Sequence, residues 1–424
     1  MFIFVLSDFK HSMKVFKFGG ASVRDAEGVK NIAQLLNVVG CKDVFMVLSA
    51  MGKTTNALEE AVRLYFGNSD YQAKISEIQS CHFAIISDLF ESNHAVYDEI
   101  RHLFDDLSLF FRKNKSPNYD FVYDQAVSFG ELVSTKIVSH YLNLCGIENQ
   151  WLDVRDYIKT DDTYREGKVD FNKSCQNLNK LSKEKFYLTQ GFLGSDDNHF
   201  TTTLGREGSD YSAAIIAQCL DAESMTIWKD VPGVLNADPR HFENPVLLNE
   251  ISYQEAIELA YYGASVIHPK TMQPLQQKGI PFFVKSFLKP TEGGTRIGKG
   301  LKTRPEVPCY ILKQNQNLLT LTTRDFSFIT EDKISRIFNM LHNMKLKVNL
   351  MQNSAVTLSL CVEDKFSQLD KFIDEINPDF MIECEKTVSL YTVRNFENLN
   401  ESVPGEGEEL LRQIIKNTLQ IIRR

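Results

Sequence analysis

A lysine near the end of a short apolar run is followed by two glycines and a serine. The run is Val15–Phe18, with Lys17 inside it, and Gly19, Gly20 and Ser22 precede a helical pattern. Backbone N–H groups beside glycine can approach a phosphate closely, and the start of a helix adds positive potential. The segment predicts a phosphate site, with a plain tight turn as the alternative.

A second glycine-bearing loop, residues 204–210, leads into another helical pattern. Ser209 and Asp210 suit the start of a helix, and capping alone would account for them. Capping gives no role to Arg206, whose planar guanidinium matches the geometry of a carboxylate. This loop therefore predicts a carboxylate site beside a helix start.

Three further segments carry weaker or misleading patterns. Glu131 follows Gly130 in a helical pattern, and because a helical glycine costs about 1 kcal/mol relative to alanine, we expect another group to approach closely there. Taken alone, Glu131 would be an exposed carboxylate, and the run 228–240, which ends a strand, fits a plain loop and a functional segment equally well. Residues 51–55 look like the end of a P-loop, but Val47 stands where the first glycine belongs, so we reject a P-loop.

The elements that position these residues alternate between short apolar runs and longer helical patterns. This alternation predicts an α/β sheet packed between helices, with residues 57–120 as a largely helical insertion. The expected strands are Val15–Phe18, Val44–Leu48, Trp151–Val154, Phe186–Thr189, Met225–Trp228 and Pro281–Val284. The expected helices are Ala26–Val39, Gln125–Leu144, Tyr211–Leu220 and Tyr253–Tyr261.

Length and composition limit the class of protein. The 424 residues exceed the roughly 250–300 at which single cores stop growing, so we expect two or more domains. A formal net charge of -8 argues against nucleic acid or anionic lipid as a partner. Eight cysteines without a CxxC pair or a Cys/His cluster predict no zinc site and a reducing compartment. No apolar run reaches the roughly 18 residues of a membrane span, so we expect a cytoplasmic protein without a membrane partner.

Proline and glycine residues at 289–296, and the linker-like stretch after them, mark the expected domain boundary. We predict one domain over residues 13–300 and a second over residues 305–424. The first domain begins at Met13, which directly precedes the first strand pattern, and this leaves residues 1–12 as an expected dispensable tail.

Beyond the boundary the pattern has the order β-α-β-β-α-β, which is the ferredoxin-like order. The expected strands are Leu318–Thr323, Leu346–Met351, Val356–Val362, Phe380–Cys384 and Val388–Val393, and the expected helices are Lys333–Asn343 and Phe366–Ile376. The remaining residues predict a helix at Glu408–Lys416 and a strand at Thr418–Ile422, which together are too short for a second complete module.

Taken together, these segments resemble the amino-acid kinase family and, within it, the aspartate kinases. The matching segments, in the family's order, are Lys17–Val23, Val47–Ala50 with Thr55 and Asn56, Ser128–Glu131, Gln190–Gly194, Thr203–Asp210, Asp230–Gly233 with Asp238–Arg240, and Gly263–Pro269. The resemblance spans nearly the whole chain. It implies a three-layer αβα sandwich with a mostly parallel sheet, followed by a ferredoxin-like α+β region.

The resemblance also implies a reaction: transfer of the γ-phosphoryl group of ATP to the side-chain carboxylate of L-aspartate, giving 4-phospho-L-aspartate for the synthesis of lysine, threonine and methionine. Lys17 would bridge the β- and γ-phosphates, and Asp210 would organise this lysine and the Mg²⁺ that ATP carries. Nucleotide contacts would come from Lys17, Gly19, Gly20, Ser22, Lys229, Asp230, Arg240, Ser265 and Val266. Aspartate contacts would come from Ser49, Thr55, Phe192 and Ser209, from Glu131 toward the ammonium, and from Arg206 toward the α-carboxylate.

This chemistry needs no general base, because the β-carboxylate of aspartate has an ordinary pKa of about 3.9 and is already ionised near neutral pH. The reaction requires neutralisation of negative charge and in-line positioning, which lysine, Mg²⁺ and backbone donors supply. His268 is therefore expected to be structural, and no metal site made of protein ligands alone is expected.

The C-terminal region resembles an ACT module, which in this family occurs twice, binds inhibitory amino acids and pairs across a dimer. The resemblance implies lysine or threonine as an effector and a homodimer through the ACT region. One module would be complete, and Cys309–Leu312 and Ser389–Val393 would belong to a second, truncated and interleaved one. Ser265 stands where the family has lysine, Leu235 where it has tyrosine, and Asn349 where lysine-sensitive relatives have aspartate.

Other functions make different demands on the sequence. A sister kinase acting on glutamate, acetylglutamate or UMP would keep the phosphate loop without an ACT-like region. A catalytically silent amino-acid sensor would have lost Lys17, Arg206 or Asp210, and all three are present. A fused homoserine dehydrogenase is not expected, because no dinucleotide-binding βαβ unit follows residue 300.

Overall fold

The computed structural model describes residues 13–264, 267–396 and 405–424, so the expected tail at 1–12 lies outside the described residues. The described chain forms two compact units. The first unit contains residues 13–234, 247–256 and 267–303, and the second contains residues 235–246, 257–264, 304–396 and 405–424.

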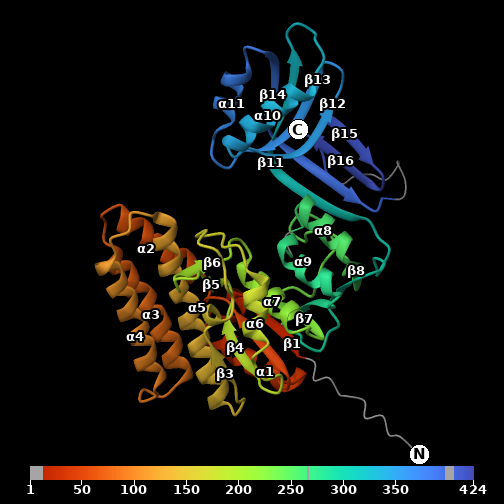
Figure 1. Cartoon of the computed structure of the whole chain (residues 1–424). Helices are drawn as coiled ribbons and strands as arrows, with labels where there is room; N and C mark the ends of the chain where they lie inside the picture. Colours follow the sequence, from red (N-terminus) through yellow and green to blue (C-terminus); the bar gives the residue numbers. More distant parts are fainter. Residues whose placement is uncertain (1–12, 265–266, 397–404) are drawn as a thin grey trace, which may run out of the picture. The chain divides into compact units, whose positions relative to one another are not determined.

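An eight-stranded sheet forms the centre of the first unit in the described residues (Figure 1). Its order is β3-β4-β2-β1-β7-β9-β10-β8, and all neighbours pair in parallel except β9 and β10. The strands are β1 (Lys14–Phe18), β2 (Val44–Leu48), β3 (Gln150–Leu152), β4 (Tyr187–Gln190), β7 (Ser224–Lys229), β8 (Glu250–Ser252), β9 (Phe282–Ser286) and β10 (Thr295–Gly298). A separate hairpin contains β5 (Leu193–Ser195) and β6 (Thr201–Thr203). The strands expected here are confirmed, with ends shifted by at most two residues.

The helices of the first unit pack on this sheet or on one another. They are α1 (Ala26–Val39), α2 (Thr54–Phe66), α3 (Tyr71–Leu89), α4 (Val96–Lys113), α5 (Tyr119–Leu144), α6 (Phe171–Leu178), α7 (Gly208–Cys219) and α9 (Pro269–Lys278). Two 3-10 turns, η1 (Gly20–Val23) and η2 (Val154–Asp156), accompany them. A further helix, α8 (Tyr253–Tyr262), begins in the first unit, and its end belongs to the second unit. The helical insertion expected over residues 57–120 is confirmed. Within the described ranges, no helix is long and apolar enough to cross a membrane.

Helices α5 and α7 contact different sets of strands. α5 contacts β2, β3 and β4 as well as α1, whereas α7 contacts β1, β2 and β7. Successive side chains of a strand point to opposite faces of its sheet. Since Phe16 and Phe18 join the apolar cluster that contains α1 and α5 residues, Lys17 points to the other face, toward α7.

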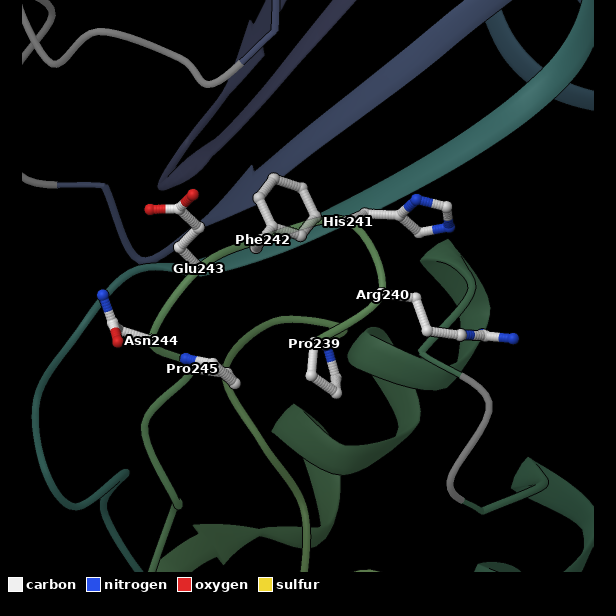
Figure 2. Close-up of a pocket in the computed structure, with 7 residues that line it drawn as sticks. All are labelled: Pro239, Arg240, His241, Phe242, Glu243, Asn244 and Pro245. Carbon is white, nitrogen blue, oxygen red and sulfur yellow. The ribbon is translucent and has the colours of Figure 1, made fainter.

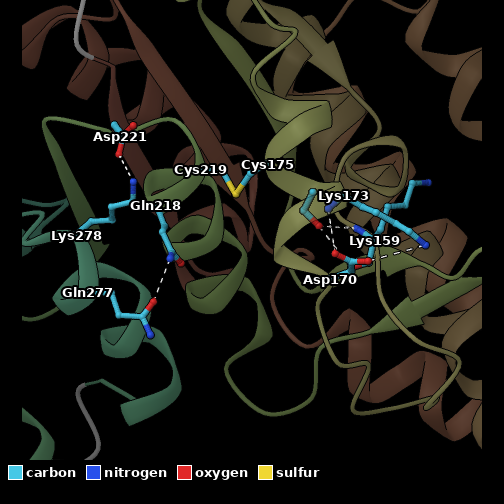
Figure 3. The surroundings of a disulfide bond; sticks show 10 residues. Lys159, Asp170, Lys173, Cys175, Gln218, Cys219, Asp221, Gln277 and Lys278 are labelled. Carbon is cyan, nitrogen blue, oxygen red and sulfur yellow. Dashed lines mark hydrogen bonds and ion pairs between the residues drawn. A yellow bond between two sulfur atoms is a disulfide. The ribbon is translucent and has the colours of Figure 1, made fainter.

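A disulfide between Cys175 and Cys219 joins α6 to the C-terminal end of α7 (Figure 3). The scattered cysteines predict a reducing compartment, and their spacing gives no sign of this pair, because 44 residues separate the two and the packing of α6 on α7 brings them together. The same end of α7 is tied to α9, since Gln218 donates to Gln277 at 3.1 Å and Asp221 pairs with Lys278 at 2.7 Å. α7 is thus anchored at the end opposite to Asp210.

The second unit is built on a six-stranded antiparallel sheet in the order β12-β13-β11-β14-β16-β15. Its elements are β11 (Cys309–Thr323), α10 (Glu331–Asn343), β12 (Lys347–Asn353), β13 (Thr357–Glu363), α11 (Leu369–Ile376), β14 (Phe380–Arg394), β15 (Glu409–Ile415) and β16 (Thr418–Arg423). Ile337 and Leu341 of α10 and Phe372 of α11 bury their side chains against one face of this sheet. The expected β-α-β-β-α-β order is confirmed, except that Phe380–Cys384 and Val388–Val393 are parts of one strand, β14.

The helix expected at Glu408–Lys416 is wrong, because these residues form β15. Leu410, Leu411 and Ile414 recur at a helix-like spacing, but β15 pairs antiparallel with β16. Lys416 has a φ of 53°, the left-handed conformation that a two-residue hairpin turn requires. Strand pairing around this turn outweighs the helical periodicity.

Candidate active site

Four neighbouring parallel strands of the first unit are followed by segments that hold predicted site residues. Gly19 follows β1, Ser49 follows β2, Phe192 lies two residues beyond β4, and Asp230 follows β7. Parallel strands end at the same edge of a sheet, and in open α/β sheets ligands bind beyond these carboxyl ends. The fold therefore gathers residues that are far apart in the sequence at one edge.

Lys17 and Asp210 form a buried ion pair, with Nζ and Oδ1 separated by 2.5 Å. Lys17 comes from the α7 face of β1, and Asp210 lies in the first turn of α7. A cation inside an apolar sheet requires a counter-charge. The structure thus brings the two predicted catalytic residues together.

Of the glycines after β1, Gly20 has no space for a side chain and Gly19 has little. A Cβ atom on Gly19 would lie 3.3 Å from the Lys17 ammonium, and one on Gly20 would lie 2.8 Å from the carbonyl oxygens of Ala50 and Gly52. Ser22 is buried, and its hydroxyl has no hydrogen-bond partner among the described residues. The predicted phosphate segment therefore combines close-lying backbone, a lysine and an unpaired hydroxyl group.

Glu131 lies on α5 and is 2% exposed, not a surface carboxylate as its sequence context alone would indicate. Burial raises the pKa of Glu131 to about 8, with a hydrogen bond from the Ala50 backbone opposing the shift. This bond reaches Oε1 at 3.4 Å, whereas Oε2 has no hydrogen-bond partner in the part of the chain that the structure describes. A buried carboxyl with an open oxygen fits a ligand that brings a cation.

The Arg206 loop, residues 204–207, connects β6 to α7. Gly205 and Glu207 have φ angles of 76° and 54°, so the chain turns sharply at both residues. Lys270, from α9, donates to the Leu204 carbonyl at 3.0 Å. The Arg206 side chain is exposed and forms no hydrogen bond or ion pair with any described residue, which leaves the guanidinium free for an anion.

The segment after β4 packs tightly on the start of α7. Phe192 has a φ of 67°, and its backbone N–H donates to the Ser212 hydroxyl at 2.9 Å. A Cβ atom on Gly191 would lie 2.5 Å from the Ser209 side chain. The predicted substrate residues Phe192 and Ser209 are therefore neighbours.

The segment after β2 packs on α5. Ser49 donates its backbone N–H to Phe18, and its carbonyl accepts from the Ser134 hydroxyl at 2.8 Å. A Cβ atom on Gly130 would lie 3.2 Å from side chains of Ala50, Leu58 and Thr54, so the close approach predicted at this glycine is confirmed. Thr55 lies in the first turn of α2, at the end of the same segment.

Two predicted nucleotide residues, Lys229 and Asp230, lie at the end of β7, where Asp230 is exposed. Two others, Ser265 and Val266, lie outside the described residues. Their nucleotide contacts stay predictions.

Arg240, also predicted to bind nucleotide, belongs to the second unit. Its guanidinium pairs with Asp238 at 2.5 Å and remains exposed. Figure 2 shows the side chains of Arg240 and His241 on one side of a surface pocket lined by residues 239–245. The role of Arg240 stays a prediction.

Sequence reasoning missed polar residues that support the site. They are the buried residues Asp124 and Ser134 on α5 and Ser212 on α7, and the partly buried Lys270 on α9. Burial raises the pKa of Asp124 to about 6, and hydrogen bonds from Arg165 and Thr203 oppose this shift. The available signal was a row of polar residues at helical spacing in an otherwise apolar helix, α5.

His268 caps α9, because its Nδ1 accepts from the Lys270 backbone N–H at 3.2 Å. Burial, and next the positive charge of Arg206, lower the pKa of His268, so this imidazole is a neutral neighbour of the Arg206 loop. Among the described residues, no group of three or more His, Cys, Asp and Glu side chains could hold a metal ion.

The profile of the amino acid kinase family matches residues 12–286, which is well over half of the chain. The chain therefore belongs to the amino acid kinase family, as the sequence motifs predicted. Its homologues include aspartokinases. Lysine-sensitive aspartokinase 3 of Escherichia coli is 33% identical over 355 residues, covering 82% of this chain and 78% of the relative. Chloroplastic aspartokinase 1 of Arabidopsis thaliana is 31% identical over 366 residues, covering 82% of this chain and 63% of the relative.

Solved structures agree with this assignment. E. coli aspartokinase III in complex with lysine and aspartate has a TM-score of 0.82 and 28% identity, covering 97% of this chain and 95% of that chain. The same enzyme with aspartate and ADP has a TM-score of 0.77 and 27% identity, covering 97% and 96% of the two chains. The expected fold class, an α/β kinase fold followed by an ACT-type region, is confirmed.

Proposed function

We propose that this chain is an aspartate kinase, which transfers the γ-phosphoryl group of ATP to the β-carboxylate of L-aspartate and yields 4-phospho-L-aspartate and ADP. The observation that carries the proposal is Glu131. Its carboxyl is buried and one oxygen has no hydrogen-bond partner among the described residues, so a ligand with a cationic group would satisfy it. Nucleotides lack an ammonium group, whereas amino acids have one. Homology to aspartokinases supports aspartate as that amino acid.

Each end of the substrate has a separate partner in this proposal. Glu131 receives the ammonium, and Arg206, free of other ion pairs in the described residues, receives the α-carboxylate. The β-carboxylate then faces the phosphate segment, with Ser49, Thr55, Phe192 and Ser209 lining the substrate. Because this carboxylate is ionised near neutral pH, it attacks the γ-phosphorus directly and no side chain removes a proton.

Charge neutralisation falls to Lys17. Its ammonium would contact the β- and γ-phosphates, while Gly19 and Gly20 allow the phosphates to approach the backbone. Asp210 holds Lys17 in place through the ion pair. As the phosphoryl group moves, the fixed positive charge stabilises the transition state more than the ground state.

Mg²⁺ enters with the nucleotide as part of the substrate. The polar atoms present fit a hydrated Mg²⁺ ion, because Oδ2 of Asp210 and the Ser22 hydroxyl are buried without hydrogen-bond partners in the described part. Lys229, Asp230, Arg240, Ser265 and Val266 would hold the nucleoside part.

We further propose that residues 13–300 act as the catalytic domain and residues 305–424 as the regulatory region. The effector would be lysine or threonine, bound by the ACT-type region, and a homodimer would form through this region. The lysine complex of E. coli aspartokinase III supports an amino-acid effector. Asn349 is uncharged and its side chain already bonds to Lys313 and Gln316, which makes it a poor partner for a lysine ammonium. The cytoplasmic location stays a prediction.

The test is an assay of ADP release from MgATP and L-aspartate, with hydroxylamine added to trap the acyl phosphate as a hydroxamate. We expect aspartate-dependent hydroxamate that Lys17→Ala abolishes, and no product with glutamate, acetylglutamate or UMP. Lysine and threonine, added separately, identify the effector by inhibition. Binding of these amino acids without turnover of any substrate would instead support a catalytically silent sensor.

A further inference from the structure

A buried carboxylate outside the set of site residues connects α5 to the Arg206 loop. Asp124 is fully buried near the start of α5. Its Oδ2 accepts hydrogen bonds from the backbone N–H groups of Thr203, at 2.8 Å, and Arg165, at 2.9 Å. Its Oδ1 accepts from the Thr203 hydroxyl at 2.7 Å. Two of the three partners are backbone N–H groups, which can only donate, and an ionised carboxylate accepts from them more strongly than a neutral amide would.

The residues that Asp124 holds lead directly into the Arg206 loop. Thr203 is the last residue of β6, which α5 contacts (Figure 1), and its carbonyl accepts from the Gly167 N–H at 2.8 Å. A Cβ atom on Gly205 would lie 3.3 Å from the Arg165 carbonyl oxygen, so residues 165–167 support the loop from outside. Asp124 is common to both supports of the loop, because it accepts hydrogen bonds from Thr203 and from Arg165.

The next residue of the loop is held independently. The Leu204 N–H donates to the Phe192 carbonyl at 2.9 Å, and the Leu204 carbonyl accepts from Lys270 at 3.0 Å. Arg206 itself has no partner among the described residues. The position of its guanidinium therefore depends on the backbone that precedes it. That backbone begins at Thr203, which Asp124 holds by hydrogen bonds.

Glu131 lies on the same helix as Asp124. The two residues are seven positions apart, which is about two turns or 10 Å along a helix, so both side chains lie on one face of α5. Glu131 and Arg206 are the proposed partners of the two charged groups on the α-carbon of the substrate. α5 thus carries one partner itself and holds the other through Asp124.

We propose that Asp124 is a positioning residue that sets the Arg206 loop at the distance from Glu131 required by an α-amino acid. This inference rests on the proposed roles of Glu131 and Arg206 and deepens them. It adds a residue without substrate contact that determines substrate affinity and leaves the phosphoryl-transfer residues unaffected. The hydrogen-bond partners of Asp124 lie in β6 and at residue 165, and none of them belongs to the phosphate segment, so nucleotide binding should not depend on it.

The test compares steady-state kinetics of Asp124→Asn with those of the unmodified enzyme. We expect kcat/KM for aspartate to fall about 10- to 100-fold, with KM for MgATP and kcat changed less than about twofold, because only one substrate group is misplaced. Thr203→Val, which removes one of the three hydrogen bonds and is the milder change, should lower the same constant by a smaller factor. Thr203→Ser keeps the hydroxyl, so its kcat/KM for aspartate should stay close to that of the unmodified enzyme.

A double-mutant cycle separates positioning from general damage. If Asp124 acts through Arg206, adding Asp124→Asn to Arg206→Ala should cause no further loss of kcat/KM for aspartate. The matched control is Asp196→Asn. Asp196 is also buried and accepts from the backbone N–H groups of Asn198 and Phe200, but at the other end of the β5–β6 hairpin. This control should leave the aspartate constants unchanged.

Additive losses in the cycle, parallel losses in both substrate constants, or an equal effect of Asp196→Asn would overturn the inference. The proposed function is tested separately by Arg206→Ala alone. If that variant lowers kcat/KM for aspartate and neither Asp124→Asn nor Thr203→Val does so, the positioning role fails while the role of Arg206 stands. If Arg206→Ala has no effect, the role of Arg206 fails and the positioning role fails with it.

Discussion

Two clusters of polar side chains, one in each unit of the chain, are satisfied differently. In the first unit, Lys17 and Asp210 are paired, while Oε2 of Glu131 has no hydrogen-bond partner in the described part of the chain. In the second unit, Lys313 on β11 donates to Asn349 on β12 at 2.9 Å, and Asn349 donates to Gln316 at 2.7 Å. Lys313 also reaches the Tyr261 carbonyl at 3.4 Å.

This difference separates a ligand site from a structural cluster. A buried polar atom left without a partner costs about 1–3 kcal/mol, and a ligand that brings a matching group to it removes that cost. Glu131 meets this description, and the Lys313 cluster does not. Changes to Glu131 or to the Lys17–Asp210 pair should therefore lower activity, whereas changes in the Lys313 cluster should affect only stability.

The largest effect is expected from Lys17→Met. Loss of the ammonium should lower kcat by at least about 10²–10³-fold, because the transferring phosphoryl group loses its positive partner. It should also destabilise the fold by about 3–5 kcal/mol, since the fully buried Asp210 loses its counter-charge. Denaturant unfolding and the hydroxamate assay measure the two effects. Adding Asp210→Asn should recover stability without activity, and recovered activity would contradict the role of Lys17.

Glu131→Gln should come next. Aspartate would lose a charged hydrogen bond worth about 1.5–3 kcal/mol, so KM for aspartate should rise roughly 10- to 100-fold, with KM for MgATP unchanged. Stability at neutral pH should increase, because glutamine needs no proton to remain neutral when buried. Asp120→Asn is the matched control, an exposed carboxyl changed in the same way on the same helix. An unchanged KM in Glu131→Gln would exclude the ammonium contact.

The pKa of Glu131 also predicts a pH dependence. Burial raises this pKa to about 8, so the free enzyme holds a proton on Glu131 at neutral pH, and an ammonium binds only after that proton leaves. KM for aspartate should fall as pH rises from 6 toward 8, by up to about tenfold per unit. Glu131→Gln should remove this dependence, and a KM that stays constant over the range would refute the assignment.

The same group links pH to stability with a definite sign. Since the pKa of Glu131 is about 8 in the folded chain and ordinarily 4.5, the folded state binds more protons than the unfolded state between these values. Stability must therefore decrease as pH rises through this window. Comparing unfolding of the unmodified chain and Glu131→Gln across the window isolates this contribution, which should be absent from the variant.

Much of this site was predictable from the sequence because its parts are local. Gly19, Gly20 and Gly130 mark close approaches that the structure contains, and Lys17 and Asp210 stand at a strand end and a helix start that periodicity predicts. The family resemblance then placed these segments in one site. Local pattern was sufficient wherever a residue's role follows from the element it occupies.

The remaining features depend on contacts between distant segments, which periodicity does not show. The Cys175–Cys219 disulfide, the hydrogen bonds of Asp124 to Thr203 and the hairpin that replaces a helix at Glu409–Ile415 each join residues from two elements. The burial of Glu131 is similar, because its sequence context alone indicated an exposed carboxylate. Tertiary packing decided all four.

The smallest effect is expected from Lys313→Met, which tests the satisfied cluster. Removing the ammonium loses the hydrogen bonds to Asn349 and Tyr261 but also removes a partly buried charge, so stability at pH 7 should change by no more than about 1 kcal/mol and kcat should stay the same. Burial lowers the pKa of Lys313 from 10.5 to about 8, so the folded state binds fewer protons than the unfolded state between these values. The unmodified chain should therefore gain stability from Lys313 as pH rises through this window, and Lys313→Met should lack that gain.

Lys371→Met, at an exposed position of α11, is the control that should behave like the unmodified chain. A large loss of kcat in Lys313→Met would show that this cluster, like Glu131, serves catalysis, and the distinction between the two units would then fail.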